Sequence, residues 1–341
     1  MLIPKQVSIG IPTRNRSAYV VRAIRSALSQ THTDVEVVVS DNASTDDTLQ
    51  AVETISDPRL VLLRQAENIG MIGNFNVCLS AATGELFLML SDDDVLEASA
   101  IEYLSRSFYE PPAGLNAEDI GMSWCPCQIL NSEGGHMWTT EAGPALESSV
   151  QLLAGLFNGV RGPRFCSVMV RTADALSVGG YDEQRYGAVC DTANWSRVIL
   201  RYRHVCCVKE PLVHYTVHAG SVTSDSNSRD WQRWGENIGT DLTAYLRDHG
   251  RIEDEKVLRR AARNLVGNVI TSVWIQRIGQ PGWVGYLCRE VVRARKYTCT
   301  FHMLRRLIRD AWKLVGRVRG TSSRGGLRTS EVVSEKSREA H

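Results

Sequence analysis

Three consecutive carboxylates, Asp92, Asp93 and Asp94, follow an apolar run at Leu86–Leu90 and one serine. A short apolar run bounded by polar residues is typical of a buried central strand, and open α/β sheets bind ligands at the carboxyl ends of such strands. Crowded carboxylates repel one another unless a cation or hydrogen bonds offset the cost. Hard divalent ions bind through one or two carboxylates plus substrate phosphates. The run therefore predicts a metal site, with a polar loop or a helix N-cap at Asp94 as the alternative.

Polar clusters also follow three earlier strand patterns. They are Pro12–Asn15 after Val7–Ile11, Asp41–Asp46 after Val35–Val39, and Glu67–Gly70 after Leu60–Leu63. Helical patterns lie between them, at Val20–Leu28, Thr48–Ile55 and Met71–Ala82. This alternation predicts an α/β fold with a mostly parallel sheet and helices on both faces. We expect all four polar clusters at one edge of that sheet.

The chain after this alternating part is less regular, and residues 111–150 are rich in Pro, Gly and Ser. The expected elements are a helix near Val95–Leu104, a strand at Phe165–Val170, a helix through Trp195, and late strands at Val205–Val208 and Leu212–Val217 that are candidates for antiparallel pairing. From Trp231 onward the pattern is helical. We therefore predict an α/β domain at 1–225, a helical extension at 226–319 and a disordered tail at 320–341.

The 341 residues carry a net charge of +1, which is divided unevenly. Arg251–His341 holds 20 Lys and Arg against 8 Asp and Glu, a balance of +12. Such asymmetry indicates an anionic partner for the C-terminal part. A helix expected at Cys288–Val318 combines an apolar side with an arginine-rich side, which is typical of peripheral contact with an anionic membrane. Docking on the α/β domain or a dimer contact are the alternatives. No nucleic-acid-binding motif accompanies the charge, so no nucleic acid is expected.

Cysteine and hydropathy patterns indicate a cytoplasmic protein. The nine cysteines form no regular framework, and neither Cys125-Pro126-Cys127 nor Cys206-Cys207 has the spacer of common zinc or redox motifs. We expect reduced, mostly buried thiols. No signal-peptide pattern precedes Val7, and no apolar run reaches the roughly 18–20 residues that span a bilayer. The expected location is the cytoplasm, peripheral on the inner face of the plasma membrane if the basic helix binds lipid.

Several motifs occur in order along the chain. They are VSIGIPTRNR from Val7, VSDNASTDDT from Val39, ENIG from Glu67, ATGE from Ala82 and LSDDDVL from Leu90. Together they resemble the family 2 glycosyltransferases, and the resemblance spans roughly residues 7–224. It implies the GT-A fold, which is a Rossmann-like α/β fold of nucleotide-diphospho-sugar transferases. It also implies inverting, metal-dependent sugar transfer.

The resemblance implies positions for the donor and the metal. The family's nucleotide-sugar site corresponds to Pro12, Thr13, Arg14, Asp41, Asn68, Asn76 and Asp92. Within it, Asp41 would accept the ring N–H of uracil or thymine, and Asp92 would lie toward the ribose. The DxD-type motif makes Asp93 the main ligand of Mn²⁺ or Mg²⁺, with Asp94 assisting. His218 would complete the metal shell or contact the diphosphate, although a lone histidine is more often structural.

The second half of the chain supplies a base. The segment Gly179–Glu183 followed by Cys190-Asp191 resembles the family's G-G-[FY]-D-E…E-D motif. By this resemblance, Asp191 is the general base that takes a proton from an acceptor hydroxyl as the oxygen attacks the anomeric carbon. Cys190 stands where relatives often have Glu, which removes one acidic neighbour. From the residues alone, Asp191 is also a good helix N-cap.

One departure from the family's motif pattern narrows the class of nucleotide-sugar donor. Asn74-Phe75-Asn76 stands where relatives often have Ala-Arg-Asn, so an arginine that can contact base or phosphate is missing. Together with LSDDDVL, this segment is similar to the abequosyltransferase-like branch, which transfers deoxysugars in bacterial surface polysaccharides. The resemblance implies a UDP-, dTDP- or CDP-linked (deoxy)hexose as donor, and a saccharide or lipid-linked acceptor.

Three other functions are alternatives. A nucleotidyltransferase also needs carboxylates and a metal, but Gly10–Thr13 is not a Gly-rich phosphate loop. A dinucleotide dehydrogenase is disfavoured because no G-x-G-x-x-G follows the first strand. A non-catalytic sugar-nucleotide-binding subunit would have no physical need for the costly acids Asp41, Asp93 and Asp191. The sequence therefore favours an enzyme of polysaccharide biosynthesis that works by single displacement.

Overall fold

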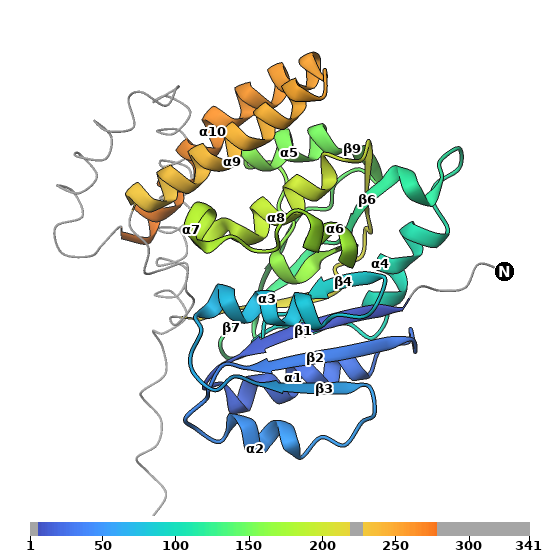
Figure 1. Cartoon of the computed structure of the whole chain (residues 1–341), viewed down its shortest axis with the longest axis vertical. Helices are drawn as coiled ribbons and strands as arrows, with labels where there is room; N and C mark the ends of the chain where they lie inside the picture. The colour runs from blue at the N-terminus through green and yellow to red at the C-terminus, as the bar shows by residue number, and fades with distance from the viewer. Residues whose placement is uncertain (1–5, 219–227, 278–341) are drawn as a thin grey trace, which may run out of the picture. The chain divides into compact units, whose positions relative to one another are not determined.

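The computed structural model describes residues 6–218 and 228–277 (Figure 1). The basic helix predicted at 288–318 and the tail at 320–341 lie outside these described residues. The chain divides into two compact units, Met1–Ile270 and Thr271–His341. Everything below concerns the first unit. Among the described helices, none has the length and apolar character needed to span a bilayer.

The described part of the chain contains a central sheet of eight strands. Its order is β3 (Leu60–Arg64), β2 (Val35–Asp41), β1 (Val7–Thr13), β4 (Leu86–Met89), β10 (Val168–Arg171), β6 (Ile120–Trp124), β11 (His204–Cys207) and β9 (Leu146–Ser148). The first four strands are parallel, as Figure 1 shows for β1 to β3, and β10 is antiparallel to both neighbours. The mostly parallel α/β sheet expected from the alternating pattern is confirmed, and its parallel strands end together at one edge.

Helices cover both faces of this sheet because the strand side chains alternate. Val7, Ile9 and Ile11 point into a core that they share with α1 (Ser17–Leu28) and α4 (Ala100–Tyr109). On the other face, Phe87 and Met89 pack with α3 (Met71–Ala81). Gly10 permits the close approach of α3, since a Cβ at this position would lie 2.9 Å from the Cβ of Cys78.

The remaining helices before α8 are α2 (Thr48–Glu53), α5 (Ser149–Phe157), α6 (Thr172–Ser177) and α7 (Glu183–Tyr186), with 3₁₀ turns at Ala117–Asp119, Phe165–Ser167 and Gly187–Val189.

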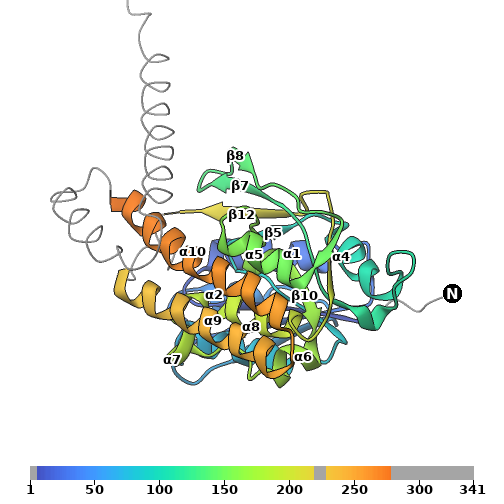
Figure 2. The same ribbon diagram turned by 90° about the horizontal axis from the view of Figure 1, so that it is seen from above.

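A second, four-stranded sheet lies beside the first and has the order β5 (Val95–Leu96), β12 (Val213–Val217), β7 (Cys127–Asn131) and β8 (His136–Thr139) (Figure 2). The helix expected near Val95–Leu104 begins only at Ala100, because Val95 and Leu96 pair with β12 instead. Residues 111–150, which the sequence left irregular, supply β6 to β9. Each late strand has one antiparallel and one parallel neighbour.

Three helices follow: α8 (Cys190–Ile199), α9 (Ser228–Asp248) and α10 (Ile252–Arg277), of which α10 belongs to the first unit as far as Ile270. The apolar sides of α9 and α10, including Ile238, Leu242 and Leu258, belong to the core that covers one face of the central sheet. Helices α9 and α10 lie side by side in both views (Figures 1 and 2). Within the first unit, which ends at Ile270, these two helices therefore contribute to the core of the α/β domain.

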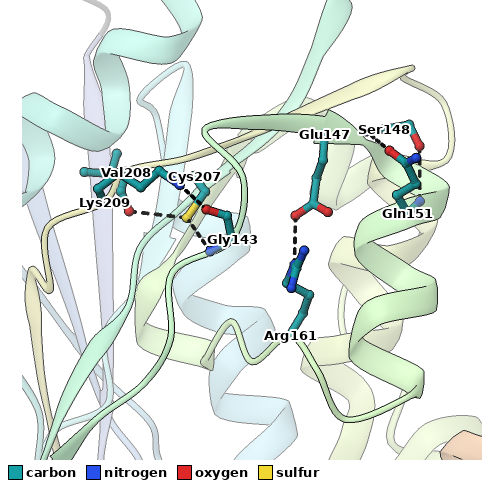
Figure 3. A network of polar contacts seen from close by, with 8 residues as sticks. All are labelled: Gly143, Glu147, Ser148, Gln151, Arg161, Cys207, Val208 and Lys209. Atoms are coloured by element: carbon teal, nitrogen blue, oxygen red, sulfur yellow. Dashed lines mark hydrogen bonds and ion pairs between the residues drawn. The ribbon is translucent and has the colours of Figure 1, made fainter.

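A buried ion pair fixes the edge of the central sheet at β9 (Figure 3). The Glu147 side chain is only 5% exposed, and the nearest guanidinium nitrogen of Arg161 lies 3.4 Å from its carboxylate. Burial raises the pKa of Glu147, while the charges of Arg161 and Lys209 oppose that rise. Lys209, which follows β11, donates to the backbone oxygen of Gly143 and so connects the loop before β9 to the end of β11.

We expect Arg161→Met to lower the free energy of unfolding by about 2 kcal/mol near neutral pH, because it leaves Glu147 charged and buried without a partner. The loss should become smaller as pH falls through the raised pKa of Glu147, because protonation removes the charge. Urea denaturation over a series of pH values measures it. The Glu147→Gln/Arg161→Met double variant is the control and should recover most of the loss; an equally unstable double variant would contradict this explanation.

Candidate active site

A cavity of about 440 Å³ opens at the carboxyl ends of β1, β2 and β4. Of the side chains predicted to bind ligands, the following line it: Pro12, Thr13, Arg14, Asn68, Asp92, Asp93 and Asp191. Asp93 and Asp191 are almost a hundred positions apart in sequence, and they share this one hollow. Asp41, Asn76, Asp94 and His218 are not among the lining residues.

The turn after β4 separates the three consecutive aspartates. Asp92 accepts a hydrogen bond from the Thr13 hydroxyl at 2.7 Å, and Asp93 contacts Nε2 of His218 at 2.6 Å. Burial, with the negative charge of Asp93 as a further cause, raises the pKa of Asp92 to about 6. Thr13 and Arg16 act in the opposite direction. The cavity therefore has two acidic groups at one wall, and one of them holds its proton more tightly than an ordinary aspartate.

Asp92 gives a pH-dependent stability prediction for the metal-free protein. Because its folded-state pKa of about 6 exceeds the usual value of about 3.9, ionised Asp92 costs stability. That cost is absent below about pH 4, grows up to about pH 6 and then stays constant. Asp92→Asn should therefore raise the free energy of unfolding by up to about 2–3 kcal/mol at about pH 7.5, and much less at about pH 4. Urea titrations in EDTA test it, and an equal gain at both pH values would contradict it.

The structure does not place Asp94 as a metal ligand. The backbone N–H of Asp94 donates to the Ser91 oxygen across a turn, and Asp94 is not among the residues that line the cavity. The residue is 1% exposed, and its carboxylate accepts from the Thr216 backbone N–H at 2.9 Å. Burial and the Asp93 charge hold the pKa of Asp94 well above its usual value, which favours the neutral acid. The helix N-cap alternative is also wrong, because a strand follows.

His218 lies directly behind the acidic wall. Its Nε2 is 2.6 Å from Asp93 and 3.2 Å from a guanidinium nitrogen of Arg16, and its ring stacks on Tyr19. Only 10% of the side chain is exposed. Arg16 itself lines the cavity. A cation is therefore available on the β1–α1 loop, although the arginine expected from relatives is absent from α3.

The loops after β1 and β2 are held together by side chains. Asn15 has a positive φ of 54°, and its side chain accepts from the backbone N–H of Thr45 at 2.7 Å. Asp41 is buried, and its carboxylate accepts from the Ser44 backbone N–H and hydroxyl within its own turn. Its predicted contact with a nucleobase stays a prediction. The backbone strain in this loop is of the kind that collects at binding sites.

The turn before α3 is formed by two asparagines. Asn42 donates to the side-chain oxygen of Asn68 at 2.9 Å and to the Gly70 oxygen at 3.0 Å. Gly70 has a φ of 80°, which glycine adopts without strain. Both asparagines line the cavity, so the Glu67–Gly70 motif serves to shape the site.

On α3, the predicted ligand Asn76 has a structural contact instead. Its amide donates to the Tyr181 oxygen and accepts from the Tyr181 N–H, both at 2.8 Å. Both contacts fix the Gly179–Asp182 turn, so the nucleotide-binding role predicted for Asn76 does not fit its position. Asn74, half a helical turn earlier, faces the cavity and accepts from the Ser40 hydroxyl at 2.6 Å.

Asp191 enters the cavity from the first turn of α8. The helix begins at Cys190 with Val189 as its N-cap, so the N-cap interpretation of Asp191 is wrong. Burial raises the pKa of Asp191, although contacts with Thr192 and the charge of Arg164 oppose the rise. A carboxylate with a raised pKa is a stronger base. Cys190, in the position where relatives often have Glu, is 2% exposed and also lines the cavity.

Sequence reasoning missed several lining residues. They are Arg16, Asn42, Met71, Asn74, Phe75, Phe165, Ala188 and Tyr215, together with Gly70, Ser91, Cys190 and Thr216. Phe75 and Phe165 are in contact, with ring centroids 4.9 Å apart. Their proximity depends on α3 meeting a 3₁₀ turn some ninety positions later. Asn42 and Gly70 belong to the polar clusters Asp41–Asp46 and Glu67–Gly70, and Arg16 directly follows Pro12–Asn15, so the sequence could have suggested these three.

The chain's donor atoms suit a metal that arrives with a phosphate. Among the described residues, no group of three or more His, Cys, Asp and Glu side chains is arranged to hold an ion. Asp93 and His218 supply one oxygen and one nitrogen, a pair that Mn²⁺ accepts. Ions of this kind often take only one or two protein ligands and complete their shell with substrate phosphates and water. The residues present therefore fit a divalent ion carried by a nucleoside diphosphate.

The fold recurs in solved structures. Staphylococcus aureus TarS, residues 1–349, in complex with UDP-GlcNAc is similar with a TM-score of 0.53 and 18% identity, over 86% of this chain and 90% of that one. The mannosyltransferase PcManGT from Pyrobaculum calidifontis, in complex with GDP-Man and Mn²⁺, has a TM-score of 0.50 and 15% identity, over 91% and 88%. The fold is that of the GT-A glycosyltransferases.

Sequence comparison gives a family match over the first part of the chain. Residues 8–119 match the model of glycosyl transferase family 2. An uncharacterised protein of Mycobacterium tuberculosis is 31% identical over 60% of this chain and 65% of its own length. A GalNAc(5)-diNAcBac-PP-undecaprenol β-1,3-glucosyltransferase of Campylobacter jejuni is 37% identical over 32% of this chain and 36% of its own. The chain thus spans less than two thirds of these relatives.

Proposed function

We propose that this protein is an inverting glycosyltransferase that moves a (deoxy)hexose from a nucleoside-diphosphate sugar to a saccharide or lipid-linked acceptor in surface polysaccharide biosynthesis. The observation that carries the proposal is the shared cavity, in which Asp93 comes from the end of β4 and Asp191 from the start of α8. The match of residues 8–119 to glycosyl transferase family 2 supports the class of reaction. The donor and acceptor classes rest on the residues that line the cavity and on the relatives.

In the proposed reaction, Asp191 takes the proton of an acceptor hydroxyl while the hydroxyl oxygen forms a bond to the anomeric carbon. The bond from that carbon to the diphosphate oxygen breaks in the same step, and the nucleoside diphosphate leaves with the electron pair. Asp93 and His218 would hold a divalent ion, which supplies Lewis-acid stabilisation of the leaving group's charge. Arg16 adds a positive charge at the same wall. No covalent intermediate with the protein is needed.

The donor and acceptor are proposed from chemistry and from relatives. TarS and PcManGT are described with UDP-GlcNAc and with GDP-Man and Mn²⁺, which supports a nucleoside-diphosphate sugar and a metal here. The Campylobacter relative is named for an undecaprenol diphosphate acceptor, which supports a lipid-linked saccharide. We favour a UDP-, dTDP- or CDP-linked donor of the abequosyltransferase-like type, because α3 carries Asn74-Phe75-Asn76 instead of an arginine.

A lipid-linked acceptor would bring the protein to the inner face of the plasma membrane. The sequence from Cys288 to Val318 supports this proposal by its basic and apolar pattern. We expect the triple variant with Arg305, Arg306 and Arg309 changed to Glu to lose most of its binding to anionic liposomes in flotation, while neutral liposomes serve as the control. Unchanged flotation would exclude the basic segment as a membrane contact.

The decisive first experiment is a thermal-shift screen of nucleotide sugars with Mn²⁺, since a ligand that binds only the folded state raises apparent stability. The best ligand is then incubated with the protein, and the released product is identified. Free nucleoside diphosphate supports glycosyl transfer or donor hydrolysis. Pyrophosphate would indicate the nucleotidyltransferase alternative. Binding without any turnover above background would indicate a non-catalytic sugar-nucleotide-binding subunit.

A further inference from the structure

The segment that leads into Asp191 is held from outside by helix α9. This segment runs from Asp182 through α7 and the 3₁₀ turn at Gly187–Val189 into α8. Its inner side reaches the cavity, which Ala188, Cys190 and Asp191 line. Its outer side packs on α9, which begins almost forty positions after Asp191 and belongs to the same compact unit.

The closest contact is between Gly187 and Trp234 of α9. A Cβ at Gly187 would lie 2.0 Å from Cε2 of the Trp234 indole, and the Gly187 φ of 47° is itself unfavourable for other residues. Trp234 is 8% exposed and packs edge-on against Trp231, with ring centroids 5.5 Å apart. A rigid aromatic surface therefore lies against the backbone three residues before Cys190 and fixes how far the turn can move outward.

Polar contacts from α9 hold the residues just before this turn. Asp241 accepts from Nε of Arg185 at 2.6 Å, from a second Arg185 nitrogen, and from the Tyr186 hydroxyl at 2.5 Å. Asn237 donates to the Arg185 backbone oxygen at 2.7 Å. A two-point guanidinium–carboxylate contact fixes orientation as well as distance. The carboxylate of Asp241 thus joins two consecutive side chains of α7 to one point on α9.

We propose that Trp234 and Asp241 are positioning residues of the transfer reaction, which set the place of Asp191 through the segment Arg185–Cys190. The inference rests on the proposed function, because it assigns α9 a task in catalysis. Only Ala188, Val189 and Cys190 separate Gly187 from Asp191, so a shift of the turn moves the carboxylate. A displacement of about 1 Å at a reacting group can cost roughly a hundredfold in rate. The acidic wall at Asp93 lies in the loop between β4 and β5, outside the segment that α9 holds.

The main variant is Asp241→Asn in the full-length protein, since it keeps the size of the side chain and weakens the contact with Arg185. The matched control is Asp174→Asn. Asp174 accepts from the Tyr202 hydroxyl at 2.6 Å and lies 3.8 Å from Arg201, so it has similar partners, and it does not line the cavity. Its side chain is 18% exposed against 23% for Asp241. Trp234→Phe is a second variant, which keeps an aromatic side chain and reduces the contact with Gly187.

For both α9 variants we expect kcat for hydrolysis of the selected nucleotide sugar to fall about tenfold or more, with its KM within about twofold of wild type. Hydrogen–deuterium exchange should increase in peptides that cover residues 183–191. Asp174→Asn should keep kcat even if its Tm falls by a similar amount. This pattern supports a positioning role, because a loss of folded protein alone would change neither kcat per folded molecule nor exchange in one segment.

The proposal is overturned if Asp241→Asn and Trp234→Phe lower Tm while kcat per folded molecule stays at the wild-type value. A parallel loss of kcat in the Asp174→Asn control would also overturn it, since the effect would then be general. If the wild-type protein hydrolyses no nucleotide sugar, the proposed function is contradicted independently of this inference. Hydrogen exchange alone then tests whether α9 holds the segment. Unchanged exchange at 183–191 would then show that α9 does not hold the segment.

Discussion

Asp191→Asn is expected to reduce the rate of sugar transfer by about 10²–10⁴-fold, which is the usual contribution of a general base. The substitution keeps the size and shape of the side chain but removes its ability to take the acceptor proton. Binding of UDP with Mn²⁺ should stay close to wild type, because the wall formed by the ends of β1 and β4 is unchanged. Single-turnover rates and isothermal calorimetry measure the two quantities separately.

The pH profile gives a second readout for the same residue. Since burial raises the pKa of Asp191, kcat/KM should fall as pH drops through a value above that of an ordinary aspartate. Asp191→Asn should remove this acidic limb. The control is Asp182→Asn, because Asp182 caps α7 by accepting from the Arg185 N–H at 2.9 Å and asparagine caps equally well. Near-wild-type transfer by Asp191→Asn, with the limb intact, would eliminate Asp191 as the base.

Asp93→Ala is expected to abolish the effect of Mn²⁺ on nucleotide binding and to lower turnover by about 10²–10³-fold, since Lewis-acid stabilisation contributes several kcal/mol. The carboxylate lies in the cavity beside His218, where it can reach an ion carried by a diphosphate. Calorimetric titration of UDP with and without Mn²⁺, and turnover with and without EDTA, measure the loss.

The neighbouring aspartate offers a matched control for this experiment. Asp94→Asn should keep its response to Mn²⁺, because the Asp94 carboxylate is buried and accepts from the Thr216 backbone N–H. If Asp94→Asn lost its response to Mn²⁺ and Asp93→Ala kept it, Asp94 rather than Asp93 would be the metal ligand. Full activity of Asp93→Ala in the presence of EDTA would remove metal chemistry from the proposal altogether.

The local sequence was sufficient for the parallel half of the fold. Val7, Ile9 and Ile11 alternate with small or polar residues, and the intervening helices have apolar faces at helical spacing, so β1 to β4 and their helices followed from periodicity. The polar clusters at the ends of these strands follow from the same pattern, because parallel strands end at one edge. For Pro12, Thr13 and Asn68, this reasoning was enough to place them in the cavity.

Residues 111–150 could not be assigned in the same way. Their strands are short, and β6 is bordered by β10 and β11, which come much later in the chain. Val95 and Leu96 have a helical pattern locally, but pairing with β12 overrides it. Contacts between distant segments decide such cases, and periodicity within one segment does not contain them.

Side-chain direction was likewise decided by the tertiary structure. Asp92, Asp93 and Asp94 are equivalent in composition, yet one turn directs two of them into the cavity and buries the third against Thr216. The sequence by itself determined the fold class and the acidic strand end, because these depend on residue type and spacing. Asp191 shares a cavity with Asp93 only because α8 and α9 pack on the sheet. The distance between these two residues depends on contacts between segments far apart in the chain, which residue type and spacing do not contain.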